Sequence, residues 1–209
     1  MKGILEGDIF QTVAARHGHF QLESGHHGDL WLDLGLLFSQ PRRVLPWCVE
    51  LAKQLAPFQV EVVCGPLIEG SFAGLLVASE LEATFVYSER FMRASQDGLF
   101  PADYRLPEAA RALVRGKRTA IVNDVINAGS AVRGTWEDVE LRGARNVAIG
   151  AFMTLGNRAR KFAESRNLPL KALVEEPIEI WEPAACPLCG TGVPLEDPGG
   201  FARAFEQRS

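Results

Sequence analysis

The sequence predicts an α/β fold in which helices flank a central, mostly parallel sheet. Three observations carry this prediction. Short apolar runs with strand character alternate with longer stretches of helical periodicity along the chain. Polar and small residues directly follow several of these apolar runs, which is where open parallel sheets bind ligands. A small-residue loop at 127–131 separates one apolar run from a helical stretch, as in sites for phosphate groups.

The N-terminal half supplies the first strands and helices of this pattern. Residues 5–16 have the spacing of a short amphipathic helix, whereas residues 18–36 are rich in Gly and His and predict loop and short strand. Residues 41–56 carry apolar side chains at helical spacing, and Pro41 suits a first helical turn. The elements expected next are a strand at 60–64, a helix at 71–82 and a strand at 83–87.

The C-terminal half continues the alternation. The expected elements are a strand at 119–122, a helix at 130–142, a strand at 147–154, a helix at 157–167 and a strand at 171–174. Right-handed crossovers bring the carboxyl ends of parallel strands to one edge of the sheet. The polar or small groups at such ends are Cys64-Gly65-Pro66, Ser88-Glu89-Arg90, Asn123-Asp124 and Thr154-Leu155. We therefore expect them to form one ligand site.

Length and composition fit a single domain spanning residues 1–209. The chain is 47% hydrophobic and 23% charged, as is typical of a soluble globular protein with a sizeable core. Its formal net charge of −4 disfavours a broad nucleic-acid-binding surface, which would normally be basic. No apolar run reaches the length of a membrane span, and the first ten residues lack a signal-peptide core. The expected location is the cytoplasm.

Residues 121–131, Ile-Val-Asn-Asp-Val-Ile-Asn-Ala-Gly-Ser-Ala, resemble the signature of type I phosphoribosyltransferases. That signature is an apolar strand, two acids, two aliphatic residues and a small-residue loop. Further segments resemble the orotate phosphoribosyltransferase group in the same order along the chain. They are 18–26 (hood), 63–70 (pyrophosphate loop), 85–90 (strand ending in a phosphate-binding Arg) and 186–195 (C-terminal tail). The resemblance implies a core at about 41–175 beneath a small hood, formed by residues 1–40 and part of the tail.

The resemblance also implies Mg²⁺-dependent transfer of a phosphoribosyl group from phosphoribosyl pyrophosphate to orotate, in pyrimidine nucleotide synthesis, by a homodimer. Asp124 would bind a ribose hydroxyl directly or through the hydrated metal, with Asn123 beside it, and Arg90 would neutralise the pyrophosphate. The remaining residues that the resemblance assigns to substrate binding are Gly65, Pro66, Leu67, Ile68, Glu69, Gly70, Val125, Ile126, Asn127, Ala128, Gly129, Ser130, Ala131, His26, Arg93, Arg105 and Arg158.

Three departures from the family pattern leave alternatives open. Asn123 replaces an acid and brings no negative charge. The stretch 91–100 contains a single basic residue, Arg93, where many members carry several. Thr154-Leu155 stands where the family commonly has an Asp-Arg pair whose Arg grips the orotate carboxylate. One alternative is a phosphoribosyltransferase for another nitrogenous base. The other is a non-catalytic protein that binds phosphoribosyl pyrophosphate or a nucleotide.

The four cysteines are too few and too scattered for a disulfide framework. Cys186 and Cys189 have the spacing of half a zinc site, but tetrahedral zinc needs two more ligands. Because the chain has no second pair of this kind, packing of the tail is the favoured interpretation. A metal held across a dimer is the alternative.

The histidines lie near the N-terminus. The adjacent pair His26 and His27 is expected in a loop near the ligand, with a metal-binding pair as the alternative. His17 and His19 flank a glycine and are expected to be structural.

Overall fold

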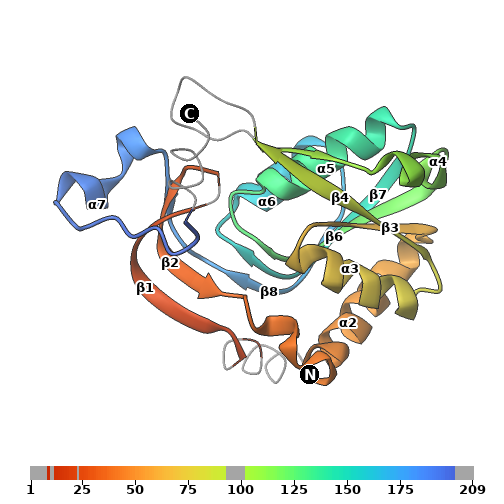
Figure 1. The fold of residues 1–209 in the computed structure, drawn as a ribbon, viewed down its shortest axis with the longest axis horizontal. Coiled ribbons are helices and arrows are strands. Elements are labelled where there is room, and N and C mark those ends of the chain that lie inside the picture. The colour runs from red at the N-terminus through yellow and green to blue at the C-terminus, as the bar shows by residue number, and fades with distance from the viewer. Residues whose placement is uncertain (1–8, 10–11, 23, 93–101, 201–209) are drawn as a thin grey trace.

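The structure is a computed structural model that describes residues 9, 12–22, 24–92 and 102–200. Its centre is a six-stranded sheet with strand order β5-β4-β3-β6-β7-β8 (Figure 1). The strands are β3 (Val62–Pro66), β4 (Thr84–Met92), β5 (Ala102–Arg105), β6 (Arg118–Ile126), β7 (Arg145–Leu155) and β8 (Leu170–Glu176). All neighbours are parallel except β5, which pairs antiparallel with β4 at one edge. The predicted α/β fold with a mostly parallel sheet is confirmed.

Helices cover both faces of this sheet. The helices are α2 (Pro41–Leu55), α3 (Glu69–Glu80), α4 (Arg111–Val114), α5 (Ser130–Leu141) and α6 (Arg158–Ser165). The pair α2 and α3 packs on one face, and α5 and α6 pack on the other. Because side chains alternate along a strand, Ala120 and Val122 face the first pair while Ile121 faces the second. None of the helices in the described part of the chain is long and apolar enough to cross a membrane.

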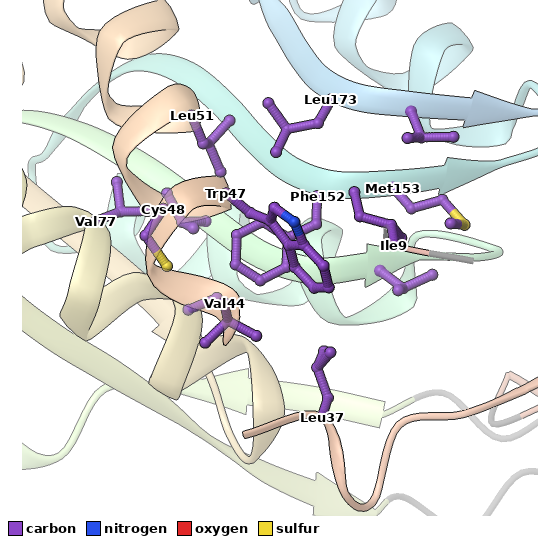
Figure 2. Close-up of a cluster of buried hydrophobic side chains, with 14 of the residues drawn as sticks. Ile9, Leu37, Val44, Trp47, Cys48, Leu51, Val77, Phe152, Met153 and Leu173 are labelled. Atoms are coloured by element: carbon purple, nitrogen blue, oxygen red, sulfur yellow. The ribbon is translucent and has the colours of Figure 1, made fainter. Parts of the chain in front are cut away.

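The core beneath α2 explains why its sequence forms a helix there. Apolar residues three and four apart place one continuous stripe against the sheet (Figure 2). Within that stripe the Trp47 indole meets the Phe152 ring of β7 edge-on, with centroids 5.7 Å apart. Both side chains are at most 2% exposed. This packing fixes the face of the sheet opposite to α5 and so holds β6 and β7 in place.

The hood is a second, three-stranded sheet with strand order β1-β2-β9. Its strands are β1 (Ala14–Gln21), β2 (His27–Asp33) and β9 (Ile180–Trp181), and all of them pair antiparallel. The short helix α7 (Pro187–Gly190) follows β9. Beyond it, the Glu196 amide donates to the His19 carbonyl, and the Gln21 amide donates to the Glu196 carbonyl. The two ends of the chain therefore build the hood together.

Two predicted boundaries near the site are wrong. The helix expected over 5–16 cannot extend to its predicted end, because β1 begins at Ala14 and pairs with β2. Pairing in the hairpin overrides the local helical spacing. The strand expected at 119–122 continues to Ile126, so Asn123 and Asp124 lie within β6 and not beyond it. The short strands β5 and β9 were not predicted, since edge strands of two to four residues leave little periodicity.

Candidate active site

The carboxyl ends of β3, β4 and β6 face the hood and enclose a cavity of about 710 Å³. The hood contributes residues 30–35 of β2 and the turn after it, and the core contributes the loop 66–70. Arg90 of β4 and both Asn123 and Asp124 of β6 also line this space. A smaller hollow beside it is lined by residues 125–132, together with Leu22 and Ser24 of the hood. The predicted gathering is present for the ends of β3, β4 and β6, whereas Thr154 and Leu155 of β7 line neither cavity.

The smaller hollow is shaped by the loop between β6 and α5. Gly129 adopts a φ of +83°, a left-handed conformation that favours glycine, and α5 begins at the next residue, Ser130. The first N–H groups of a helix have no partner within the helix, and its dipole adds partial positive charge there. The Asn127 Oδ1 atom is buried without a hydrogen-bond partner among the described residues. Such a loop can hold an anion of phosphate size.

The loop after β3 depends on two glycines. A Cβ atom on Gly65 would lie 2.5 Å from the Gly70 carbonyl oxygen and 2.7 Å from the Ser71 Cα. A Cβ atom on Gly70 would lie 2.0 Å from the Asn123 Oδ1. The loop turns through a cis peptide bond between Leu67 and Ile68, and Glu69 starts α3. Both glycines are therefore needed for the close packing of this loop against α3 and against Asn123.

The two polar residues of β6 have different surroundings. Asp124 is 4% exposed and is one of the residues that line the larger cavity. Asn123, 8% exposed, lines both cavities, and its Nδ2 donates to the Val125 carbonyl at 2.9 Å. The amide of Asn123 therefore braces the start of the phosphate-sized loop. A carboxylate at this position could not donate that hydrogen bond.

Replacing Asn123 with Asp is expected to lower the free energy of unfolding by about 1–3 kcal/mol, because it puts an acceptor against the Val125 carbonyl. Chemical denaturation at neutral pH would measure the loss. An Asn123→Ser variant, which keeps a hydroxyl donor, serves for comparison and should lose less. Equal stability of the Asp variant and the parent would contradict the bracing role of the amide.

Two arginines that the resemblance assigns to substrate binding, Arg90 and Arg105, lie in different places. Arg90 pairs across the strands with Tyr104 and lines the larger cavity. Arg105 is half exposed, donates to Asp103 at 3.1 Å and covers the Phe91 ring. It lines a separate hollow beside α5. Arg93 lies outside the described residues. The structure therefore brings Arg90 to the site and leaves Arg105 away from it.

His26 and Arg158, two of the basic residues assigned to substrate binding, lie side by side. Arg158 Nη1 and His26 Nε2 are 2.9 Å apart, and Glu182 Oε1 lies 2.8 Å from the same His26 nitrogen. The other ring nitrogen, Nδ1, is 2.9 Å from the Ser24 Oγ, and Ser24 lines the smaller hollow. Glu182 was missed, since a single acid 156 residues from its partner gives no pattern in the sequence.

The neighbouring thiol and strand end offer no further reactive group. Cys64, directly before the glycine loop, is fully buried, and burial raises the pKa of its thiol well above the usual range. It therefore stays protonated as a core residue. Thr154 and Leu155, at the end of β7, are 3% and 1% exposed. The basic residue closest in sequence to this strand end is Arg158, at the start of α6.

Comparisons with known proteins identify the fold and the family. No protein-family model matches the chain. Among solved structures, it resembles UMP synthase from Leishmania donovani with a TM-score of 0.63, at 19% identity over 82% of this chain and 36% of that one. It also resembles APRTase from Giardia lamblia complexed with 9-deazaadenine, with a TM-score of 0.62, at 14% identity over 82% of this chain and 97% of that one.

At these identities the solved structures show the fold alone. The sequence comparison goes further, because the chain is 30% identical over 201 residues to a protein from Thermotoga maritima named orotate phosphoribosyltransferase. The match covers 95% of this chain and 97% of that protein. With so much of both sequences aligned, this chain belongs to the orotate phosphoribosyltransferase family.

Proposed function

We propose that this protein transfers the phosphoribosyl group of phosphoribosyl pyrophosphate to orotate, forming orotidine 5′-monophosphate and pyrophosphate. One observation carries the proposal. In this chain, which belongs to the family, the glycine loop, Asp124 and the loop before α5 line two adjoining cavities beneath the hood. In the reaction, a ring nitrogen of orotate bonds to the anomeric carbon of the ribose. The bond from that carbon to pyrophosphate breaks, and the ring nitrogen gives up its proton.

We assign each group of the substrate to a different part of the site. The 5′-phosphate suits the loop 127–131, where helix N–H groups and the dipole of α5 favour an anion. The pyrophosphate suits the glycine loop 65–70, with Arg90 supplying positive charge. Asp124 then lies between these subsites, where its carboxylate can accept hydrogen bonds from ribose hydroxyls. A negative charge there stabilises the ribosyl cation that develops as pyrophosphate leaves.

The acidic side chains of the cavity fit a magnesium-bound substrate. Asp124, Glu69 and Glu89 all line it, and magnesium prefers carboxylate and phosphate oxygens. When bound with the diphosphate, the ion would neutralise charge on the leaving group. This also accounts for Glu69, whose carboxylate would otherwise repel pyrophosphate. The Asn123 amide contributes no charge, so Asp124 is the residue of β6 that we assign to the metal.

The orotate carboxylate suits the cluster of His26, Arg158 and Glu182. Two of these groups carry or can carry positive charge, and Glu182 is half exposed and able to move aside. Planar guanidinium groups bind carboxylates with two parallel hydrogen bonds. We therefore assign binding of the orotate carboxylate to Arg158, because Thr154 and Leu155 at the end of β7 are buried and carry no charge.

Arg158→Gln is expected to raise KM for orotate by roughly 10- to 100-fold, the equivalent of losing a charge-assisted hydrogen-bond pair. KM for phosphoribosyl pyrophosphate should change little, because Arg158 does not line the larger cavity. Steady-state kinetics with each substrate varied in turn would measure both values. Arg160→Gln is the matched control, since Arg160 lies two residues further along α6 and pairs with Glu175. Equal effects of the two variants would contradict the role of Arg158.

A direct assay tests the proposed function itself. Protein, Mg²⁺, orotate and phosphoribosyl pyrophosphate are mixed, and the loss of orotate absorbance is followed. Pyrophosphate release with another base but not with orotate would favour a different acceptor. Tight binding of phosphoribosyl pyrophosphate by calorimetry, with no release on any base, would favour a non-catalytic binding protein. The family resemblance also supports a homodimer, which sedimentation equilibrium would test.

A further inference from the structure

Four metal-ligating side chains converge on the hood, away from the cavity. They are His19 of β1, His27 of β2, Cys186 just before α7 and Cys189 within it, and their ligand atoms all lie within 4.8 Å of one another. His19, His27 and Cys186 are at most 6% exposed, and Cys189 reaches the surface. We propose that these residues form a tetrahedral Cys₂His₂ zinc site that fastens the C-terminal segment to the hood.

The distances suit such a site. Zinc bonds of about 2.3 Å to sulfur and 2.0–2.1 Å to nitrogen, at tetrahedral angles, separate two nitrogens by about 3.3 Å and a nitrogen from a sulfur by about 3.6 Å. His19 Nε2 and His27 Nδ1 are 3.1 Å apart. Cys186 Sγ lies 3.4 Å and Cys189 Sγ 3.7 Å from His19 Nε2, and Cys189 Sγ lies 3.3 Å from His27 Nδ1. These four separations are therefore each within about 0.3 Å of those in a tetrahedral zinc site.

The surrounding hydrogen bonds orient the ligands. His19 Nδ1 lies 2.8 Å from the Val193 carbonyl, an acceptor, so the proton of a neutral ring sits on Nδ1. Nε2 then carries the lone pair that faces the cluster. A second hydrogen bond of this kind fixes the tautomer and ring orientation of many metal-bound histidines. The Val193 amide in turn donates to Leu188 of α7, which ties this acceptor to the helix between the cysteines.

Hydrogen bonding alone accounts poorly for the cluster. The single lone pair of His19 Nε2 faces three neighbours, and it can accept fully from only one of them. If the two thiols donate to the two rings, the lone pairs of His19 Nε2 and His27 Nδ1 face each other at 3.1 Å with no proton between them, which costs stability. One cation satisfies all four atoms together. Sulfur and imidazole ligands in a tetrahedral set select zinc and not magnesium.

The site would be structural. Four protein ligands close the coordination sphere, so no position is open for substrate or water. In Figure 1, α7 lies beyond β1 and β2 as seen from the six-stranded sheet, away from the strand ends that line the cavity. The ion would instead join β1 and β2 to a segment 167 residues further along the chain. Zinc therefore holds the hood that covers the active-site cavity.

In the proposed zinc site, His19 and His27 take the place of a second cysteine pair. The turn between β1 and β2 brings residues 19 and 27 together, and an irregularity in strand register lies between His17 and Phe20. His26 belongs to the other group, with Arg158 and Glu182. His27 begins β2 and does not lie in the expected loop, and the alternative of a metal-binding pair formed by His26 and His27 finds no support because the two side chains join different groups. Only the folded hairpin reveals the pairing of His19 with His27.

The test is metal content and metal-dependent stability of the full chain. The protein is purified under reducing conditions and its zinc is measured by mass spectrometry, with about one ion per chain expected. After removal of zinc by a chelator, Co²⁺ is added as a probe. A tetrahedral site with two thiolates should give intense visible d–d bands and a near-ultraviolet charge-transfer band. Chelation should also lower the melting temperature, and added zinc should restore it.

Matched variants separate this site from nonspecific binding. The double variant Cys186→Ser with Cys189→Ser should lose zinc, the cobalt spectrum and the effect of chelator on melting. His17→Gln removes an exposed histidine two residues from His19 and should retain all three. If the double variant fails to fold, Cys189→Ser alone should weaken zinc binding at least about tenfold in a competition titration, since losing a ligand weakens coordination.

Three results would overturn the proposal. The first is a parent protein that holds no zinc and shows no charge-transfer band with Co²⁺. The second is a disulfide between Cys186 and Cys189 in place of a metal, found by intact-mass measurement under non-reducing conditions. The third is a double variant that binds zinc as tightly as the parent. All these measurements are independent of turnover, so they stand apart from the test of the proposed reaction.

Discussion

Replacing Asp124 with Asn is expected to lower kcat/KM for phosphoribosyl pyrophosphate by roughly 10²- to 10³-fold, the size found when a single preorganised electrostatic group is removed. The substitution keeps the shape of a side chain that is 4% exposed and removes only its charge. Among the residues of β6 that line the cavity, Asp124 is the charged one, because Asn123 is neutral and donates to the Val125 carbonyl. Steady-state kinetics at saturating orotate would measure the loss.

Stability gives the control for Asp124→Asn. Because Asn has nearly the same shape as Asp, the variant should keep a cooperative melting transition, which thermal unfolding would check. Glu164→Gln makes the same chemical change on the exposed surface of α6 and should leave both kinetics and melting unchanged. If Asp124→Asn kept kcat/KM within about threefold of the parent, Asp124 would make no interaction specific to the transition state.

Gly65→Ala is expected to damage both folding and substrate binding. The new Cβ would lie 2.5 Å and 2.7 Å from backbone atoms of Gly70 and Ser71, and backbone cannot rotate away as a side chain can. Overpacking of this kind typically costs about 1–3 kcal/mol and displaces the backbone. Moving the loop also removes the surface that we assign to pyrophosphate. Chemical denaturation would measure the first effect, and calorimetric titration with phosphoribosyl pyrophosphate the second.

Gly190→Ala is the matched control for this substitution. A Cβ on Gly190 would meet nothing within 4 Å, and its backbone does not adopt a positive φ. This variant should fold and bind substrate like the parent. A stable Gly65→Ala protein with unchanged affinity would mean that the glycine loop does not hold the substrate in the arrangement described.

Sequence patterns predicted the parts of the site that are contiguous in the chain. The loop 127–131 and the glycines at 65 and 70 each carry a local backbone requirement, and these leave a trace in residue type. The role of the Asn123 amide was not predictable, since its acceptor is a backbone carbonyl that any residue at 125 would supply. Arg158 and His26 were named separately, but their contact depends on how the hood lies over α6.

The hood shows the same limit more strongly. The sequence predicts loop and short strand over 18–36, and it contains no pattern that pairs this region with residues 180–196. Those contacts depend on tertiary packing between the two ends of the chain. The zinc ligands are therefore visible in the sequence as residue types but not as a set. The spacing of Cys186 and Cys189 indicates half of the set, whereas the pairing of His19 with His27 depends on the folded hairpin.

The two-ended construction of the hood has a consequence for protein synthesis. The strands of the six-stranded sheet are all available once β8 has left the ribosome. The hairpin of β1 and β2 gains its remaining partners, β9, α7 and Glu196, only after these have also emerged. Domains emerge from the N-terminus first, and contacts between distant residues form late. A nascent chain therefore exposes its hood hairpin until translation is nearly finished. A chain that ends before Cys186 would keep β1, β2 and β9 but lose the hydrogen bonds between Glu196 and β1, which leaves one edge of the hood accessible to chaperones and proteases.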